Sequence, residues 1–382
     1  MRLGADFSAL IDRFSLESKQ PVALAVSGGS DSLALLFLSH HWAKMTGRSL
    51  IALTVDHGLR PEAKFEAAVV AAHCADLGIQ HQTLCWIDPK PTQSAARTAR
   101  YRLLARAVQD AGASCLLTGH TLDDVIETAL IRRRRGVRGP IQAGPALAAP
   151  LPAWPDGRGI ALLRPLVSTT RAALRIYLEA RNIEWMDDPS NDNPSFERVR
   201  VRKFLARHNS LAAMASRAVM TLQAERARAD AALGEELAEI AIKADGLIET
   251  PAPALSPRLA GLLARCASGG HRDPRGGAVK DMLANLTTPG SRQTLGGAWF
   301  QRTQSGFAIG RDPANGRSQS ESALFDGRYV RDSGAELPDR SDASFLVRHA
   351  LPGDLGWREV ISERLAHMRH CYLTPFYDCI SE

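Results

Sequence analysis

The feature that most constrains the fold is an alternation of short apolar runs and longer stretches with helical spacing, over about the first 130 residues. Four apolar runs predict strands at residues 21–26, 49–55, 79–86 and 114–120. The stretches that follow each run predict helices at residues 31–45, 62–77, 94–112 and 121–135. This order predicts an α/β fold, a parallel sheet with helices on both faces, which binds ligands beyond the carboxyl ends of its strands.

The rest of the chain follows a different pattern. Residues 136–159, rich in Pro, Gly and Ala, interrupt the alternation, and a strand near 161–164 and a helix near 170–182 come next. Residues 209–245 predict one long helix leading into a second domain that is helical to about residue 286 and then strand-like, with a hairpin turn at Ser305 and Gly306. We therefore expect two domains, residues 1–208 and 209–382.

Composition narrows the class of protein. The 382 residues are 45% hydrophobic and 23% charged, which is ordinary for a globular chain, and the formal net charge of +6 permits a nucleic-acid partner without requiring one. The six cysteines form no CxxC pair, which argues against a zinc site or a disulfide framework. The sequence lacks both a run of apolar residues long enough for a membrane helix and the apolar core of a signal peptide. We therefore expect a cytoplasmic protein with no membrane partner.

The segment SGGSDS, residues 27–32, lies where the first predicted strand passes into the first predicted helix. Gly28 and Gly29 let the chain curl so that N–H groups at the start of the helix converge on an anion, most plausibly a phosphate. Asp31 supplies a carboxylate for Mg²⁺, and the hydroxyl groups of the segment add donors, at Ser27, Ser30 and Ser32. The alternative is a plain helix-capping turn. The segment matches neither GxxxxGK[ST] nor GxGxxG, which disfavours a P-loop NTPase and a dinucleotide dehydrogenase.

Polar residues also follow the second and fourth predicted strands. Asp56 and His57, in VDHGLR, emerge at the rim where a nucleoside would lie, and a polar turn is the alternative there. His120 and Asp124, in GHTLDD, are four residues apart at the start of a helix and therefore share a face. Glu127 follows on that face, either behind the site or as a surface carboxylate.

Arginines are grouped at helical spacing in three places: Arg97 with Arg100, the run at residues 132–135, and Arg198 with Arg202. Such faces contact phosphates in some proteins and are simply solvated in others, and the residue pattern leaves both interpretations open.

These motifs together resemble a known family. SGGxDS after a first strand resembles the pyrophosphate loop (PP-loop) of the ATP pyrophosphatase superfamily, whose fold is similar to that of the adenine nucleotide alpha hydrolases. Five further motifs occur in the order seen in tRNA(Ile)-lysidine synthetases: VDHGLR, AARTARYRLL, TGHTLDDVIETALIR, RPL and DPSN. The resemblance covers about residues 20–205, and the second domain adds only TLGG at 294–297.

The resemblance implies a reaction. ATP would adenylate the oxygen at carbon two of the wobble cytidine of a tRNA(Ile) with a CAU anticodon, and free L-lysine would then displace AMP to give lysidine. It implies ATP and Mg²⁺ as cofactors. It also implies that residues 1–208 form the ATP-binding and catalytic domain, and that residues 209–382 form a helical linker and a tRNA-recognition region. It also places Arg100 at a catalytic position, ties His120 and Asp124 to ATP and magnesium, and makes Arg97 an RNA or phosphate contact. Asp31, Asp124 and His120 are the candidates to accept a proton from the lysine amine, and the sequence does not rank them.

The chain departs from the family pattern in two places. Val137 and Arg138 replace the Ser-Gly of an R-G-S-G motif, which puts the substrate contact of that loop in doubt. Val199 stands where the family has Asn, although Arg198 and Arg202 are retained. We expect tRNA contacts at five arginines: Arg97, Arg132, Arg135, Arg198 and Arg202.

The sequence is also compatible with two other functions. The first is another PP-loop enzyme, either a tRNA thiolase, whose sulfur-carrying cysteine pairs are missing here, or an amide-forming ATP-dependent ligase. The second is a catalytically silent RNA-binding module, which would leave ATP intact. The sequence leaves the oligomeric state open, with a homodimer among the states considered.

Overall fold

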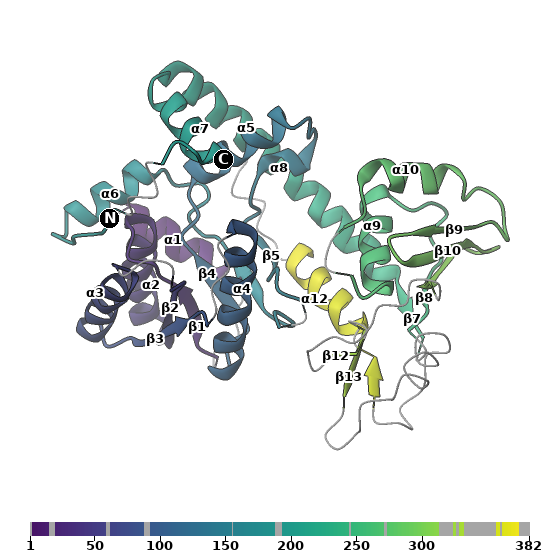
Figure 1. Cartoon of the computed structure of the whole chain (residues 1–382), viewed down its shortest axis with the longest axis horizontal. Coiled ribbons are helices and arrows are strands. Elements are labelled where there is room, and N and C mark those ends of the chain that lie inside the picture. Colours follow the sequence, from purple (N-terminus) through teal and green to yellow (C-terminus); the bar gives the residue numbers. More distant parts are fainter. Residues whose placement is uncertain are drawn as a thin grey trace. The chain divides into compact units, whose positions relative to one another are not determined.

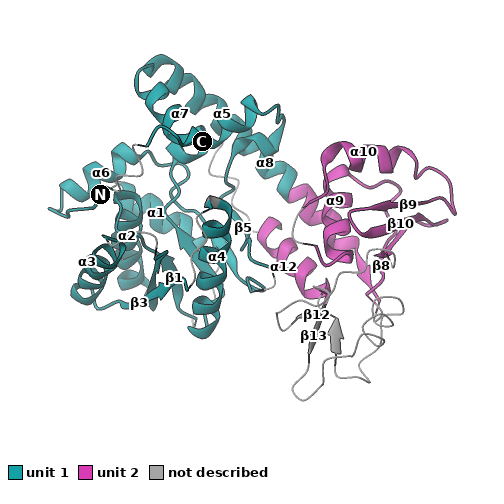
Figure 2. Cartoon of the chain, viewed as in Figure 1, with its two compact units in different colours: residues 1–230, 374–382 teal, residues 231–373 magenta. Residues whose placement is uncertain are grey.

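The computed structural model describes most of the chain, namely residues 2–14, 20–58, 62–87, 92–154, 156–187, 193–243, 246–270, 273–312, 324–325, 328–331, 357–359 and 361–373. It contains two compact units (Figure 2). Unit 1 holds the described residues up to Asp230, and unit 2 holds those from Ala231 to Leu373. The predicted domain boundary after residue 208 stays a prediction, because the long helix α8 (Asn209–Glu236) runs from one unit into the other.

Unit 1 is built on a six-stranded sheet with the strand order β3-β2-β1-β4-β6-β5 (Figure 1). All neighbouring pairs are parallel except β5 with β6, which is antiparallel. The strands are β1 (Val22–Ala25), β2 (Leu50–Asp56), β3 (Gln80–Cys85), β4 (Cys115–Thr118), β5 (Ala148–Pro150) and β6 (Ala161–Leu163). The predicted α/β class and mostly parallel sheet are confirmed.

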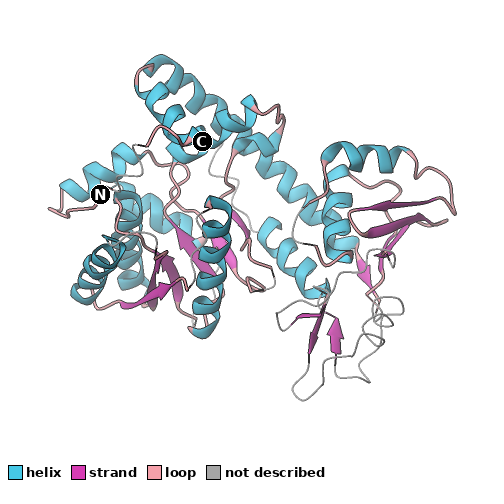
Figure 3. Ribbon diagram, in the orientation of Figure 1, coloured by secondary structure: helices cyan, strands magenta, loops and turns pink. Residues whose placement is uncertain are grey.

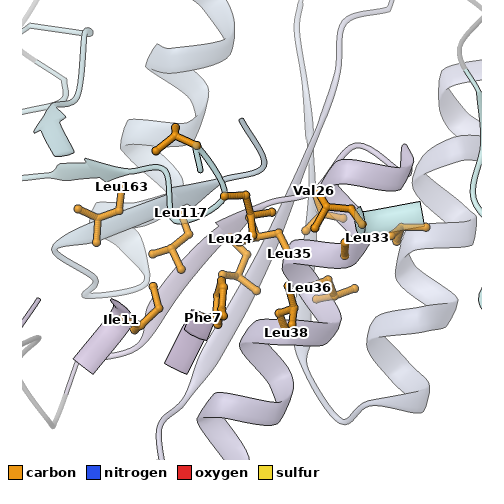
Figure 4. Close-up of a cluster of buried hydrophobic side chains, with 14 of the residues drawn as sticks. Phe7, Ile11, Leu24, Val26, Leu33, Leu35, Leu36, Leu38, Leu117 and Leu163 are labelled. Carbon is orange, nitrogen blue, oxygen red and sulfur yellow. The ribbon is translucent and has the colours of Figure 1, made fainter. Parts of the chain in front are cut away.

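Helices cover both faces of this sheet. Alternate residues of a strand point to opposite faces, so that Leu24, Leu117 and Leu163 enter one core while Leu116 and Leu162 enter the other. Figure 4 shows the first core, where these leucines meet side chains of α1 and α2. Helix α4 covers the opposite face. The helices of the unit besides α8 are α1 (Arg2–Asp12), α2 (Ser30–Thr46), α3 (Glu62–Asp76), α4 (Gln93–Asp110), α5 (Leu122–Arg134), α6 (Arg171–Glu179) and α7 (Glu197–Ala206).

The carboxyl ends of three central strands meet at one edge of the sheet. Ala25 of β1 is in register with Leu53 of β2 and with Thr118 of β4. The segments that leave these strands are therefore neighbours, although they are separated along the chain. They are SGGSDS, VDHG and TGHT, the motifs in which the sequence places the site.

Several elements differ from the sequence prediction. Strand β5 and a 3-10 helix at Pro140–Ala143 form within the Pro/Gly/Ala-rich stretch, and the N-terminal helix α1 was not predicted. Helix α8 ends at Glu236 rather than near residue 245, where β7 (Ala241–Ile242) has formed instead. The sequence after residue 240 pairs as strands because β8 (Ile248–Thr250) finds a partner far along the chain, in β11.

Unit 2 combines a five-stranded antiparallel sheet, in the order β7-β8-β11-β10-β9, with helices packed on it (Figure 3). The predicted hairpin is confirmed as β10 (Ala298–Arg302) and β11 (Phe307–Arg311). Gly296 and Gly297 of TLGG have φ of 59° and 88°, as a two-residue hairpin turn requires. The other elements are a 3-10 helix (Leu237–Glu239), α9 (Pro257–Ala267), α10 (Gly276–Ala284), β9 (Arg292–Leu295), α12 (Ile361–Leu373) and a small sheet of β12 (Leu324–Phe325), β13 (Tyr329–Arg331) and β14 (Trp357–Glu359).

Among the described residues, none of the helices has the length and apolar character needed to cross a membrane.

Candidate active site

The SGGSDS loop has the form expected of an anion-binding turn. Gly28 has a φ of +85°, which curls the chain between β1 and α2. The hydroxyl of Ser32 donates to the carbonyl of Gly29 at 3.0 Å and accepts from the N–H of Ser27 at 3.1 Å, so it closes the loop on itself. In the described part of the chain, the N–H groups of Gly29, Ser30 and Asp31 at the start of α2 have no hydrogen-bond partner. They are the donors that a phosphate would use.

The glycines of the loop differ in what surrounds them. A Cβ on Gly28 would lie 2.6 Å from Cε of Met186, whose N–H donates to the Gly28 carbonyl at 3.1 Å. A Cβ on Gly29 would meet nothing closer than the Met186 carbonyl at 3.8 Å. The protein itself therefore leaves room for a Cβ at position 29, whereas a Cβ at position 28 would clash with Met186.

A third glycine brings two of the motifs into contact. A Cβ on Gly119 would lie 2.9 Å from the carbonyl oxygen of Asp31 and 3.1 Å from the nitrogen of Ser32. The backbone of the segment after β4 therefore packs directly on the SGGSDS loop, and Gly119 is required for that approach.

His120 follows at once and is half-buried. Its Nδ1 lies 2.9 Å from the hydroxyl oxygen of Thr118, which fixes the ring. Burial, together with the positive charge of Arg164, lowers the pKa of His120 to about 3. His120 is therefore neutral at physiological pH.

Asp31 and Asp124 are joined by an arginine that the sequence analysis did not single out. Arg171, the first residue of α6, places its Nε 3.0 Å from Oδ2 of Asp31 and its Nη2 3.2 Å from Oδ1 of Asp124. Burial raises the pKa of Asp31, although Arg171 opposes this effect. Burial would also raise the pKa of Asp124, but Arg198, Arg171 and the N–H of Thr121 lower it below its usual range.

Asp124 also organises the start of its own helix. Its Oδ2 accepts from the N–H of Thr121 at 2.9 Å, and the Thr121 hydroxyl accepts from the N–H of Asp124 at 3.4 Å. This reciprocal capping box fixes the carboxylate at the edge of the sheet.

Glu127 is the third acid of the cluster. It is 1% exposed, so the expectation of a surface carboxylate is wrong, and the alternative of a position behind the site stays a prediction. Its carboxylate pairs with Nε of Arg202 at 2.7 Å, with Nε of Arg198 at 3.0 Å and, at 3.8 Å, with Nη1 of Arg171. Arg198 and Arg202 thus share the expected helix face, which contacts Glu127, and their role as tRNA contacts stays a prediction.

Asp56 and His57 lie at the same edge, at the end of β2. Asp56 is buried, and its Oδ1 accepts from the N–H of Gly58 at 2.8 Å, as in a polar turn. The ring of His57 meets Trp86 edge-on, with centroids 6.2 Å apart. Their contact with a nucleoside stays a prediction.

Three arginines on α4 and after the end of β6 form no ion pair with a carboxylate of the described residues: Arg97, Arg100 and Arg164. The guanidinium of Arg97 lies over the ring of Tyr101, 5.0 Å from its centroid. Burial lowers the pKa of Arg100, and Arg97 adds to the effect. Arg164, of the RPL motif, is 7% exposed and donates to the carbonyl of Ala146 at 2.6 Å, while its Nε finds no hydrogen-bond partner among the residues that the structure describes.

The other arginines expected to bind RNA contact the protein itself in this structure. Arg132 donates to the carbonyl of Gly144 at 3.2 Å, and Arg226 of α8 donates to the same oxygen at 3.0 Å. Arg135 is exposed and pairs with Glu197. Arg138, at the departure from the family pattern, donates to the carbonyl of Arg133 at 2.8 Å. The DPSN motif lies outside the described residues.

Asp31 and Asp124 provide the kind of ligands that Mg²⁺ prefers. Magnesium takes carboxylate oxygens and keeps the rest of its shell for water and substrate phosphates. Two carboxylates that share one cation, Arg171, beside a loop of free N–H groups fit that requirement. In the described residues, no group of three or more acidic, His or Cys side chains forms an all-protein metal cage.

Sequence reasoning missed three residues of this site: Gly119, Arg164 and Arg171. Gly119 and Arg164 were within quoted motifs, TGH and RPL, and only the packing shows why they are needed. Arg171 gave one weak signal, because a basic residue in the first turn of a helix opposes the helix dipole unless an acid lies nearby.

Comparison with known proteins agrees with this geometry. Residues 4–209 match the family model of the PP-loop domain. The tRNA(Ile)-lysidine synthase of Hyphomonas neptunium is 42% identical over 72% of this chain and 77% of its own length. The synthase of Brucella anthropi is 39% identical over 79% of this chain and 70% of its own length. That of Rhizobium meliloti is 36% identical over 85% of this chain and 76% of its own length. The chain therefore belongs to the tRNA(Ile)-lysidine synthase family, whose catalytic unit is a PP-loop domain.

Proposed function

We propose that this chain uses ATP to join free L-lysine to carbon two of the wobble cytidine of a tRNA(Ile) with a CAU anticodon. The cytidine oxygen attacks the α-phosphorus of ATP, and pyrophosphate leaves. The lysine ε-amine then attacks carbon two, AMP leaves with the oxygen, and lysidine remains. The observation that carries the proposal is the free N–H groups of the SGGSDS loop beside His120, Asp31 and Asp124, in a chain of this family.

The loop binds the part of ATP that departs. Its N–H groups and the dipole of helix α2 stabilise negative charge on pyrophosphate. This stabilisation accelerates the reaction because the charge on pyrophosphate increases as it leaves. Ser27 and Ser32 keep the loop closed through their mutual contact at 3.2 Å. Asp31 and Asp124 would hold Mg²⁺, which when bound neutralises phosphate charge.

Cationic residues near His120 accept the remaining anions. Arg100 and Arg97 on α4 are available to phosphate oxygens, and among the described residues no carboxylate forms an ion pair with either. We infer that Arg132 and Arg135 take part in tRNA binding from the protein surface, and that tRNA contact by Arg198 and Arg202 depends on their pairing with Glu127. The substrate is a tRNA, so the cytoplasm is the compartment that we propose.

The lysine amine has to lose a proton before it attacks, since its unperturbed pKa is about 10.4. Asp124 is a suitable partner for a substrate with two amino groups, because Arg198 and Arg171 lower the pKa of its carboxyl. His120 is neutral and could accept a proton, but its lowered pKa makes it a weak base.

The proposal is tested by lysine ligation. Purified protein is incubated with Mg²⁺, ATP, labelled lysine and a CAU-anticodon tRNA(Ile) transcript, and label in the RNA and AMP are both measured. We expect label in the RNA, and AMP, only when all substrates are present. Intact ATP would favour a silent RNA-binding module, and AMP without labelled RNA would favour another PP-loop enzyme.

A matched pair of glycine variants tests the loop. Gly29→Val should abolish both products in a folded protein, because a side chain fits the protein at this position but occupies the place of the phosphate. Gly277→Val is the control, since a Cβ on Gly277 in α10 meets nothing within 4 Å. Full activity of folded Gly29→Val would contradict the loop assignment.

The order of the chemistry is tested without lysine. If His120 and Asp124 serve adenylation, His120→Ala and Asp124→Asn should block transfer of labelled α-phosphate to tRNA. The Asn variant keeps a cap for Thr121 and changes only the charge. Wild-type amounts of trapped adenylate in both variants would contradict this role.

A further inference from the structure

We propose that Arg171 is a displaceable counter-cation: it holds Asp31 and Asp124 together until Mg²⁺ enters with ATP and takes its place between them. This inference rests on the proposed function, because it concerns the metal of the same site. It adds a role for a residue that the proposed reaction does not otherwise use.

The first support is that Arg171 and a metal ion would need the same oxygens. Its guanidinium bonds Oδ2 of Asp31 at 3.0 Å and Oδ1 of Asp124 at 3.2 Å. Magnesium binds carboxylate oxygens at about 2.0–2.1 Å and tolerates little distortion of its octahedral shell. A guanidinium and a divalent cation cannot both occupy this short bridge, since they repel each other and compete for the same lone pairs.

The second support is that the other acids do not depend on Arg171. Glu127 retains Arg202 at 2.7 Å and Arg198 at 3.0 Å. Asp124 retains the N–H of Thr121 at 2.9 Å. Asp31 is different, because its other described partner is the hydroxyl of Ser30 at 3.3 Å. Release of Arg171 would therefore leave one carboxylate, Asp31, in need of a cation.

The third support is that the side chain can move while its backbone stays fixed. The N–H of Arg171 donates to Oδ2 of Asp123 at 2.7 Å, and the hydroxyl of Thr170 caps the same helix through the N–H of Ala173. The Arg171 side chain is 17% exposed, so it has access to solvent. Only rotation of its side-chain torsions is needed to free the two carboxylates.

This arrangement couples metal and nucleotide binding. Metal alone has to displace a paired guanidinium, which lowers its apparent affinity. When nucleotide phosphates bind in the SGGSDS loop, they give the released guanidinium a new anionic partner and add oxygens to the metal shell. By linkage, each ligand then strengthens the other.

The test uses Mn²⁺ alone as the probe, measured by electron paramagnetic resonance on the full chain without nucleotide. Arg171→Gln should bind Mn²⁺ about tenfold more tightly than wild type, an ordinary size for removing one competing charge. Arg171→Lys, which can pair with only one carboxylate at a time, should fall between the two. Arg175→Gln is the matched control: it removes the same charge from the same helix, where Arg175 pairs with the exposed Asp187 at 2.9 Å, and should leave Mn²⁺ affinity unchanged.

A second measurement separates the inference from the proposed function. Adding a non-hydrolysable ATP analogue should tighten Mn²⁺ binding more in wild type than in Arg171→Gln. Equal or weaker Mn²⁺ binding in the folded Arg171 variants would overturn the inference, even if the analogue binds normally. Should Arg171→Gln not fold, an unchanged Mn²⁺ affinity in Arg171→Lys would overturn it equally. Absence of analogue binding in wild type would instead overturn the assignment of the loop to ATP.

Discussion

Unit 1 contains two groups of arginines that differ in their partners: one group pairs with carboxylates, and the other donates hydrogen bonds to backbone carbonyls. The carboxylate-bound group, Arg171, Arg198 and Arg202, pairs with Asp31, Asp124 and Glu127. The carbonyl-bound group, Arg132, Arg164 and Arg226, donates to backbone oxygens of Gly144 and Ala146, in the segment between α5 and β6. Among the described residues, the acid that pairs with this group is Asp230, 3.5 Å from Arg226.

The pKa values show what this difference means. Burial would lower the pKa of Arg171, but Asp31 and Asp124 outweigh it and raise the pKa. Burial lowers the pKa of Arg164 to about 10, and Arg226 contributes in the same direction. The carboxylate-bound group is close to neutral overall, so it can exchange one cation for another. The carbonyl-bound group keeps excess positive charge, so it attracts anions.

The largest effect should come from removing the acid that three arginines share. Glu127→Gln should lower the free energy of unfolding by about 3 kcal/mol, because it leaves guanidiniums without their buried counter-charge. Urea unfolding measures the loss. A change below about 1 kcal/mol would mean that water screens this cluster and that its charges are not interdependent.

Breaking the carbonyl-bound group should cost less. Arg164→Met should lower the free energy of unfolding by only about 1 kcal/mol, since losing the hydrogen bond to Ala146 is partly offset by no longer burying a charge. Arg106→Met, at an exposed position of α4, is the control. A loss of more than about 3 kcal/mol would show that this arginine behaves like the carboxylate-bound ones.

His120 responds to both groups and provides the next prediction. Arg164 lowers its pKa and Asp124 raises it. Arg164→Met should therefore raise the pKa of His120, and Asp124→Asn should lower it further, each by about one unit or less. NMR titration, with the His120 signal identified by its loss in His120→Ala, measures both shifts. Shifts of the same sign would contradict the opposing influence of the two groups.

The same shift predicts a pH dependence of stability. The folded pKa of about 3 lies below the ordinary value of 6.5, so the unfolded chain binds the extra proton first as the pH falls. The stability contributed by neutral His120 is complete above about pH 6.5 and is lost between about pH 6.5 and 3. In Arg164→Met the loss over this window should be smaller, which acid unfolding curves would show.

The smallest effect belongs to an exposed pair. Glu197→Gln removes the partner of Arg135, whose side chain is 68% exposed, and should change the free energy of unfolding by less than about 0.5 kcal/mol. Thermal unfolding should give a melting temperature almost equal to that of the wild type. A clear decrease in melting temperature would show that Glu197 contributes to stability as the buried acids do.

The sequence predicted the elements that local pattern determines. Strands β1 to β4 and their helices follow from period and from glycine positions, and the motifs at their carboxyl ends indicated the edge where the site lies. Arg171 could not be predicted, because its partners Asp31 and Asp124 lie 140 and 47 residues away along the chain. The burial of Glu127 depends likewise on α7 packing over α5. Strands β7 and β8 were missed since a short strand gains its stability from a distant partner, here β11.

Strand β5 closes one side of the unit 1 sheet in a way that affects how molecules of this protein meet. It has three residues and ends at Pro150, which has no N–H to offer a further strand. A strand of another molecule that approached the free edge of β5 would therefore find few N–H groups to pair with. At the other side, β3 presents Gln80, His81 and Gln82 in place of a continuous apolar row. The β5 side of the sheet therefore resists edge-to-edge growth, so sheets that join in a concentrated or partly heated sample should join through β3.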